Sequence, residues 1–505
     1  MVDDKTFESC MAGLETFKAS KFLMVIFGGA GDLCQKKLLP TLFLLYKKGF
    51  IEDFTILGFG LPEMTSEEYR KKAKSWLQEN LKEPFDEKIY DEKFQKHLLF
   101  ETADLKKAEN YSNLCKKITQ ITKDDPAYNL MYYLAVPPVL FPTIVHNLSD
   151  KELCRRRKGA KIIVEKPFGH DKKSAHALNL KLLEAFDENQ IYRIDHYLGK
   201  ETVQNVFFFR FGNVLFEPLW NRNYIDNIQI TVAEDMGIEN RAYFYESATV
   251  IRDFVQNHIL QLIALIAMEP PANFDQESIR NERQKVFKSI QAFDEKKIDD
   301  LVVMGQYESG VVNDKKVAGY LDEKGVAKDS KVPTYIAAKF FIDNWRWANV
   351  PFYIRTGKRL KKRCTEIAIQ FKYPPLRLLG HKCKDLDANT IVFSIYPTQK
   401  VSLTFNVKFP GMENIPYPVD MVFDYKGVFK VDTPLAYERV LIDAMKSDLS
   451  LFARQDGIET MWGIVDPIIK AWEKKKTLCK YKSGRRGPKE ADDFIKKDKR
   501  AWRIF

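Results

Sequence analysis

A short segment in the first half of the chain is dense in polar side chains that could bind a ligand. Residues 193–200, RIDHYLGK, hold five polar functional groups in eight positions. Among them, His196, Tyr197 and Lys200 can each donate a hydrogen bond to a phosphate. The segment is therefore a candidate site for a phosphorylated ligand.

A second candidate is the histidine that ends 252–258, RDFVQNH, at the start of an apolar stretch. A histidine beside an apolar helical face is by default a hydrogen-bonded core residue. A neutral imidazole, with a pKa near ~6.5, is also well placed to take a proton at neutral pH. On the residues alone, His258 fits both a packing role and a catalytic role.

Charged residues also follow a strongly apolar run, at Glu165 and Lys166. Charges at the carboxyl end of a strand lie where open α/β sheets bind ligands. Pro167 restricts the backbone of Lys166 and permits a cis bond before it. The two side chains are therefore candidates for a ligand site at the edge of a sheet.

A glycine-rich turn, GGAGDL at 28–33, directly follows the apolar run 21–27. Glycines let backbone N–H groups approach a pyrophosphate, and the helix that follows adds its positive dipole end. The spacing is GxxG and not the GxGxxG of the usual dinucleotide motif, so a tight turn without a ligand is the alternative interpretation. The apolar strand directly before the turn favours nucleotide binding. After the second strand, 58–63 (GFGLPE) offers no arginine that would favour NADP, and Glu63 fits either a ribose acceptor or a solvated loop residue.

The elements that must position these residues alternate between strand and helix patterns in the first half of the chain. Helical sequence separates short apolar runs, as is typical of a doubly wound sheet with helices on both faces. The runs lie at 21–27, 54–58, 97–102, 130–136 and 161–164. We therefore expect an α/β Rossmann-like dinucleotide-binding domain over residues 1–198.

From about residue 199 the pattern changes to β-rich runs, which indicates a large, mainly antiparallel sheet. One long helix is expected at 251–268, ended by Pro270 and Pro271. The β-rich runs lie at 203–211, 225–232, 335–345, 364–371, 390–396 and 401–407. We expect an α+β domain over 199–505 that binds substrate and mediates oligomerisation.

Composition narrows the classes of function. A chain of 505 residues is too long for one ordinary domain, so two cores are expected. The net charge of +11 permits nucleic acid, but a phosphorylated small molecule explains it equally well. The longest apolar run, 259–268, is far short of the ~20 residues of a membrane span. Seven scattered cysteines without a CxxC pair argue against a disulfide scaffold or a zinc site. The N-terminal segment is polar and unlike a signal peptide, and together with the cysteines it favours a cytoplasmic location.

Taken together, these motifs resemble the glucose-6-phosphate dehydrogenase family over about residues 27–492. RIDHYLGKE at 193–201 is the signature of that family and is very specific. The further matches are GGAGDL at 28–33, YLAVPP at 133–138, EKPFG at 165–169, WNR at 220–222, IRDFVQNH at 251–258, GQY at 305–307, VPFYIRTGK at 350–358, AYER at 436–439 and GRRGP at 484–488.

The resemblance implies oxidation of D-glucose 6-phosphate at C1 to 6-phospho-D-glucono-1,5-lactone, with hydride transfer to NADP or NAD and without a metal. It implies His258 as the base and Asp195 as the carboxylate that orients it. The substrate-binding residues would be Lys166, His196, Tyr197, Lys200, Glu234, Asp253, Lys358 and Arg363. The coenzyme-binding residues would be Gly28, Gly31, Asp32, Leu33, Lys37, Ala135 and, again, Lys166.

The chain departs from the family's pattern where the coenzyme would bind. Leu61 stands where the family commonly has an arginine for the 2′-phosphate of NADP, and Ala30 replaces a frequent serine. Loss of that arginine removes a charge-assisted contact, for which Lys36 or Lys37 could compensate in part. We therefore expect a weakened preference for NADP, with NAD used as well.

Three other classes of function compete with this interpretation. Another NAD(P)-dependent sugar dehydrogenase with an EKP lysine would not need the phosphate-binding set, and a dinucleotide-sensing regulator should lack His258 or Asp195. A nucleic-acid binder should cluster cations with aromatic residues, which only the tail at 496–503 approaches. We expect glucose 6-phosphate as ligand, no nucleic-acid or membrane partner, and a homodimer or homotetramer formed through the broad sheet.

Overall fold

The computed structural model describes residues 17–150, 159–239, 241–375, 386–430, 433–475 and 477–505. They form two compact units, each built from segments that are distant in the sequence. The first unit takes in the described residues up to Phe168, together with His176–His196 and Leu435–Ala453. The second comprises Gly169–Ala175, Tyr197–Pro434 and Arg454–Phe505. A single boundary after residue 198 does not describe this division, because the segment 435–453 returns to the first unit.

The first unit contains a seven-stranded sheet in the order β17-β6-β5-β4-β1-β2-β3. All neighbours are parallel except β17, which pairs antiparallel with β6. The strand order reverses beside β1, and open α/β sheets bind ligands at such a switch point. The strands are β1 (Phe22–Phe27), β2 (Phe54–Gly60), β3 (Leu98–Thr102), β4 (Asn129–Leu134), β5 (Lys161–Val164), β6 (Ile191–Ile194) and β17 (Phe452–Ala453). The expected Rossmann-like fold is confirmed.

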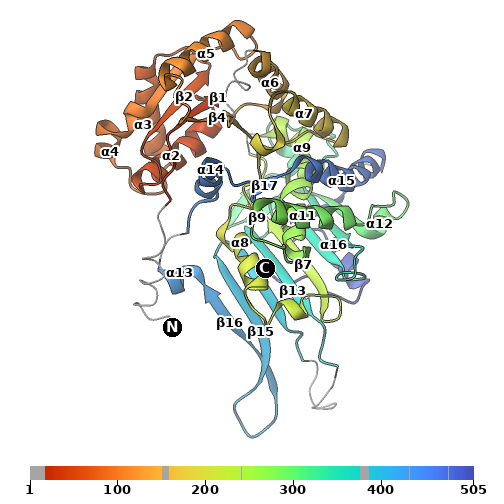
Figure 1. Ribbon diagram of the computed structural model, residues 1–505. Coiled ribbons are helices and arrows are strands. Elements are labelled where there is room, and N and C mark those ends of the chain that lie inside the picture. Colours follow the sequence, from red (N-terminus) through yellow and green to blue (C-terminus); the bar gives the residue numbers. More distant parts are fainter. Residues whose placement is uncertain (1–16, 151–158, 240, 376–385, 431–432, 476) are drawn as a thin grey trace, which may run out of the picture. The chain divides into compact units, whose positions relative to one another are not determined.

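Helices pack on this sheet because its strands are apolar on both faces; every residue of β1 is buried. Among them, α14 (Ala436–Lys446) contacts α2 (Leu39–Lys47), although the two are almost 400 residues apart in the chain (Figure 1). The others include η1 (Cys34–Leu38), α3 (Ser66–Asn80), α4 (Glu87–Glu92), α5 (Ala108–Thr122), α6 (Phe141–Asp150) and α7 (Lys172–Ala185).

The second unit is built on a nine-stranded sheet in the order β16-β15-β14-β13-β7-β12-β11-β8-β18. Neighbours are antiparallel except in the pairs β7–β12 and β8–β18, so the expected large and mainly antiparallel sheet is confirmed. The strands are β7 (Ile225–Ala233), β8 (Val302–Glu308), β11 (Tyr335–Phe340), β12 (Phe352–Gly357), β13 (Cys364–Phe371), β14 (Thr390–Tyr396), β15 (Lys400–Lys408), β16 (Pro416–Asp424) and β18 (Cys479–Lys482).

Two sequence-based expectations for the second unit were wrong in detail. The run 203–211 is not a strand but the helix α8 (Glu201–Phe211), which buries Val203, Val206 and Phe207 and contacts both β14 and α10 (Leu260–Ala267). Aromatic and β-branched residues favour strands in isolation, but packing of a helical face overrides that preference. The run 335–345 forms a strand only as far as Phe340.

The expected long helix at 251–268 is present in two parts. The π-helix η6 (Ile251–Ile259) leads into the α-helix α10 (Leu260–Ala267), and α9 (Ala242–Val250) precedes them. The stretch Ala242–Ala267 is long and apolar enough to cross a membrane, but 89% of its most apolar window is buried inside the protein. A core helix passes the same test, and this one lies against α11 (Gln276–Ser289) and α15 (Gln455–Lys475).

Candidate active site

The glycine turn after β1 brings three strand ends close together. Gly28 has a φ of +81°, and a Cβ at this position would lie 2.6 Å from the carbonyl oxygen of Ala135, just after β4. A Cβ on Gly29 would lie 2.4 Å from the Cα of Gly58 in β2. Only glycine fits such backbone distances. The turn at the switch point therefore presents bare backbone, which is the cradle that a dinucleotide pyrophosphate requires.

Side chains at the start of the next helix are already paired in part. The Lys36 ammonium lies 2.8 Å from the Asp32 carboxylate, one helical turn away, and both groups are largely exposed. An exposed pair of this kind is worth little and can re-form with a ligand. The helix begins at Asp32, directly after Gly31, so its N–H groups face the turn.

The tip of β2 bears no cation. Leu61 directly follows the strand and is 61% exposed, and the loop that runs to Thr65 has the sequence LPEMT. Thr65 and Glu68 form a capping box that begins α3. A 2′-phosphate at this tip would therefore meet an apolar side chain and Glu63, and would find no guanidinium.

Two tyrosines hold the carboxylate that follows β5. Glu165 Oε1 accepts hydrogen bonds from Tyr133 Oη at 2.6 Å and from Tyr437 Oη at 3.0 Å. Burial raises the pKa of the Glu165 carboxyl, and the two hydroxyls and Lys166 oppose that rise. The bond between Lys166 and Pro167 is cis, as the sequence allowed.

The end of β6 carries the first part of the signature. Arg193 is fully buried and its Nη1 forms ion-pair hydrogen bonds with both oxygens of Glu188, at 2.8 and 2.9 Å. Arg193 therefore anchors the strand, and Asp195 and His196 follow at its carboxyl end. The His196 ring lies nearly parallel to the Tyr437 ring, with centroids 6.4 Å apart.

In the second unit, three predicted site residues form one stack. The rings of Tyr197 and His258 lie face to face, with centroids 4.3 Å apart and planes inclined by 23°. The Lys200 ammonium lies 3.7 Å from the centroid of the same tyrosine ring. Tyr197 and His258 are buried, so the stack is fixed by packing and by a cation–π contact.

A second pair of predicted residues meets across the sheet. Lys358, at the end of β12, donates to Glu234 Oε2 at 2.5 Å, just beyond the end of β7. Only 3% of Lys358 is exposed, and its ammonium also lies 5.2 Å from the Tyr245 ring centroid. Arg363 instead lies over the ring of Tyr396, 4.4 Å from its centroid.

A strained residue in α9 lies just before the helix that carries Asp253 and His258. Thr249 is fully buried and has φ 53° and ψ 167°, a region that β-branched residues avoid at a cost of roughly 1–3 kcal/mol. The π-helix η6 follows, and short π-helical segments are frequent at functional sites. Within it, Phe254 packs edge-on against His258, with centroids 6.0 Å apart.

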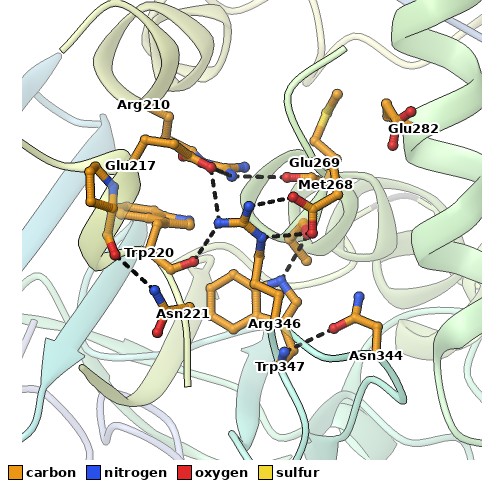
Figure 2. A network of polar contacts seen from close by, with 12 residues as sticks. Arg210, Glu217, Trp220, Asn221, Met268, Glu269, Glu282, Asn344, Arg346 and Trp347 are labelled. Carbon is orange, nitrogen blue, oxygen red and sulfur yellow. Dashed lines mark hydrogen bonds and ion pairs between the residues drawn. The ribbon is translucent and has the colours of Figure 1, made fainter. Parts of the chain in front are cut away.

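The far end of the same helix is closed by donors from other elements (Figure 2). Arg210 donates to the carbonyl oxygens of Leu265, Ile266 and Met268 at 2.9–3.1 Å. Two indole N–H groups also donate to carbonyl oxygens there: Trp220 to that of Ile266 at 2.9 Å and Trp347 to that of Ala267 at 2.8 Å. The last carbonyls of a helix lack intrahelical partners, so these side chains allow α10 to end inside the protein.

Two carboxylates keep this closure electrically balanced. Glu217 pairs with Arg210 at 3.1 Å and with Arg346 at 2.9 Å, and Glu269 also pairs with Arg346 (Figure 2). Burial lowers the pKa of Arg210 to about 10, which still leaves it charged at neutral pH.

The structure thus gathers the predicted residues into two sets. Gly28, Gly31, Asp32, Leu33, Lys37, Ala135, Lys166, Asp195 and His196 belong to the first unit, and Tyr197, Lys200, Glu234, Asp253, His258, Lys358 and Arg363 to the second. The pairing of Asp195 with His258 joins residues of different units and stays a prediction. Sequence reasoning missed Tyr133, Tyr437 and the arginine–tryptophan closure; the AYER and WNR motifs were the available signals.

Comparison with known proteins gives matches over nearly the whole chain. Residues 25–205 match the NAD binding domain of glucose-6-phosphate dehydrogenase, and residues 207–503 match its C-terminal domain. The glucose-6-phosphate 1-dehydrogenase of Bacillus subtilis is 40% identical over 97% of this chain and 99% of its own. That of Borreliella burgdorferi is 42% identical over 95% and 98%.

Comparison with solved structures points to the same family. A glucose-6-phosphate dehydrogenase in complex with its substrate glucose-6-phosphate has a TM-score of 0.87 and 33% identity, covering 97% of this chain and 100% of that one. The glucose-6-phosphate 1-dehydrogenase from Mycobacterium avium has a TM-score of 0.84 and 34% identity, covering 97% and 99%.

The glycine cradle at the switch point and the NAD binding domain match define an oxidoreductase that works with a nicotinamide dinucleotide. More particularly, the chain belongs to the glucose-6-phosphate dehydrogenase family.

Proposed function

We propose that this chain oxidises D-glucose 6-phosphate at C1 to 6-phospho-D-glucono-1,5-lactone, the first step of the oxidative pentose phosphate pathway, with NADP or NAD as hydride acceptor. The bound coenzyme supplies the hydride-accepting nicotinamide C4. His258 takes the proton of the C1 hydroxyl while the C1–H bond electrons leave as hydride, so that one C=O bond forms. Asp195 orients the imidazole and stabilises its protonated form.

The observation that carries this proposal is the stack of Lys200, Tyr197 and His258. It places two proposed phosphate ligands of the substrate against the proposed base within one unit. A phosphorylated substrate held by Tyr197 and Lys200 would thus be fixed relative to the imidazole, which is the positioning that proton transfer requires. A sugar dehydrogenase for unphosphorylated substrates would have no use for this cationic contact.

The remaining polar residues divide between the two ends of the substrate. His196 joins Tyr197 and Lys200 in binding the phosphate, and Lys166 contacts both sugar and coenzyme. Glu234 and Asp253 accept hydrogen bonds from sugar hydroxyls, with Lys358 and Arg363 as further cations. The Lys358–Glu234 contact supports this arrangement, because it orients both side chains in a largely buried place.

We assign the coenzyme to the turn at Gly28–Gly31, with Asp32, Leu33, Lys37, Ala135 and Lys166 around it. The exposed Leu61 at the β2 tip supports use of NAD as well as NADP, because a 2′-phosphate gains no guanidinium there. The Lys36 ammonium, paired with Asp32, gives at most partial compensation.

The test is absorbance at the reduced-nicotinamide band with glucose 6-phosphate, run in parallel with NADP and with NAD. Glucose without phosphate is the matched substrate control and should react far more slowly. His258→Asn should lower kcat by about 10²–10⁴-fold while KM for glucose 6-phosphate changes little. Equal rates with glucose and glucose 6-phosphate, or an unimpaired His258→Asn variant, would contradict the assignment.

We further propose that two copies of the chain associate through the outer strands of the nine-stranded sheet. The edge strand β16 exposes the apolar side chains of Tyr417, Met421 and Val422, and an unpaired edge of this kind requires a cover. Light scattering after gel filtration should give a dimer or tetramer for the native protein. Met421→Lys should shift it toward the monomer, while a matched Lys426→Met change, just beyond the strand, should not.

A cytoplasmic location is the last part of the proposal. The described cysteines Cys34, Cys115, Cys364 and Cys479 are all free thiols, which suits a reducing compartment. Subcellular fractionation with activity measurement in each fraction tests it.

A further inference from the structure

Tyr437 stands at the meeting point of two motifs that supply site residues. It belongs to α14, which reaches the first unit from a distant part of the sequence. The helix is held there by the pair between Glu438 and Lys48, at 2.7 Å, and by the buried Lys161 ammonium, which donates to the Ala444 carbonyl oxygen at 2.6 Å. The helix that carries Tyr437 is therefore anchored near both of its ends.

The hydroxyl of Tyr437 acts on the first of these motifs. It donates to Glu165 Oε1 at 3.0 Å, and Tyr133 donates to the same oxygen at 2.6 Å. Two hydroxyl donors on one oxygen favour the ionised carboxylate. Glu165 directly precedes Lys166, and the charge of that lysine also opposes the rise that burial causes in the pKa of Glu165. The tyrosine pair thus counteracts the effect of burial on the Glu165 carboxyl, which lies next to Lys166 at the carboxyl end of β5.

The ring of Tyr437 acts on the second motif. It lies 6.4 Å from the His196 ring, centroid to centroid, with the two planes inclined by only 16°. A near-parallel ring restricts rotation of the imidazole about its side-chain bonds. Tyr133, by contrast, lies within β4, and what it has in common with Tyr437 is the hydrogen bond to Glu165.

We propose that Tyr437 is a positioning residue for the dehydrogenase reaction, which aligns Lys166 through Glu165 and His196 through ring contact. The inference rests on the proposed substrate roles of Lys166 and His196. It assigns a function to the AYER motif, whose helix is anchored to the first unit by Lys48 and Lys161.

The two tyrosines provide a matched comparison. Tyr437→Phe and Tyr133→Phe each remove one donor to Glu165 Oε1, so each should lower kcat/KM for glucose 6-phosphate about tenfold. Each should also move the acid limb of the pH profile to higher pH, because a carboxylate that loses a donor binds its proton more tightly. In the background of Glu165→Gln, which has no ionisable group, neither change should move the acid limb.

Tyr437→Leu separates the two actions, because it removes the ring as well. Inorganic phosphate, used as a competitive inhibitor against glucose 6-phosphate, probes the phosphate contact of His196. Its inhibition constant should rise about three- to tenfold in Tyr437→Leu and remain unchanged in Tyr437→Phe and Tyr133→Phe. Near-ultraviolet circular dichroism confirms that the variants are folded.

Two results would overturn the inference. One is an unchanged kcat/KM in both phenylalanine variants. The other is a loss of activity that is equal at every pH and that ranks the variants in the same order as their thermal unfolding midpoints. If the native protein did not oxidise glucose 6-phosphate with either NADP or NAD, the proposed function itself would be overturned. Failure of the proposed function can therefore be distinguished from failure of the Tyr437 inference.

Discussion

The imidazole of His258 rests on the phenol ring of Tyr197, with centroids 4.3 Å apart and an inclination of 23°. The two residues come from separate motifs, and both are almost fully buried. In the proposed mechanism this tyrosine has two roles, because its ring packs against the proposed base and its hydroxyl would bind the substrate's phosphate. Variants that remove the hydroxyl and the ring separately should therefore behave differently.

Tyr197→Phe keeps the ring and should raise KM for glucose 6-phosphate about three- to tenfold, with kcat little changed, because one neutral hydrogen bond is lost. Tyr197→Leu also removes the stack and the cation–π contact with Lys200, together worth about 1–3 kcal/mol. It should lower kcat/KM by a further ten- to hundredfold, mainly through kcat. Steady-state kinetics on both variants tests this; equal losses would show that the ring itself positions nothing.

Leu61→Arg should increase the preference for NADP over NAD. A guanidinium at the exposed tip of β2 can form a charge-assisted contact with a 2′-phosphate, worth roughly 1.5–3 kcal/mol. The ratio of kcat/KM for NADP over NAD should therefore rise about ten- to hundredfold. Leu61→Gln, similar in length but neutral, is the control and should leave the ratio close to that of the native chain.

Arg210→Met should destabilise the protein severely. It leaves carbonyl oxygens at the end of α10 without their donor and Glu217 without one of its two partners, at a cost of about 3–5 kcal/mol. Trp220→Phe should cost only about 1 kcal/mol, because Ile266 O keeps its bond from Arg210. Urea midpoints that rank the two variants in the opposite order would contradict this account of the helix end.

Asp443 should make stability depend on pH in an unusual direction. Its side chain is buried, Oδ1 has no hydrogen-bond partner, and burial raises the pKa from 3.8 to about 6. The folded state therefore binds the Asp443 proton more tightly than the unfolded state does. The resulting contribution to the free energy of unfolding is fully present below pH 4 and is lost as the pH rises through 6. Asp443→Asn should raise the free energy of unfolding by up to about 3 kcal/mol at pH 8, and by about half of that at pH 5.

Urea unfolding of the native chain and the Asp443→Asn variant at both pH values measures the difference. The Arg439 ion pair, at 3.0 Å, is partly exposed, so its loss in the variant offsets only a small part of the gain. A gain that is the same at pH 5 and pH 8 would show that the carboxyl does not titrate between them.

Local patterns predicted the fold class, most strands of both sheets and the glycine turn. These depend on residues close in sequence: the fully apolar β1 followed at once by GGAGDL is one example. The helix α8 was mistaken for a strand because Val203–Phe211 has the composition of one, whereas tertiary packing against β14 and α10 favours the helix. The Tyr437 contact with Glu165 spans 272 residues, which no local pattern reveals.

The return of 435–453 to the first unit also sets an order for biosynthesis. When His196 leaves the ribosome, β6 still lacks its neighbour β17, and α2 lacks α14. About 250 further residues must be translated, which takes roughly 12–50 s at about 5–20 residues per second. The coenzyme-binding unit therefore completes its fold only after almost all of the second unit's sheet has been synthesised, and during that interval the edge at β6 is open to mispairing.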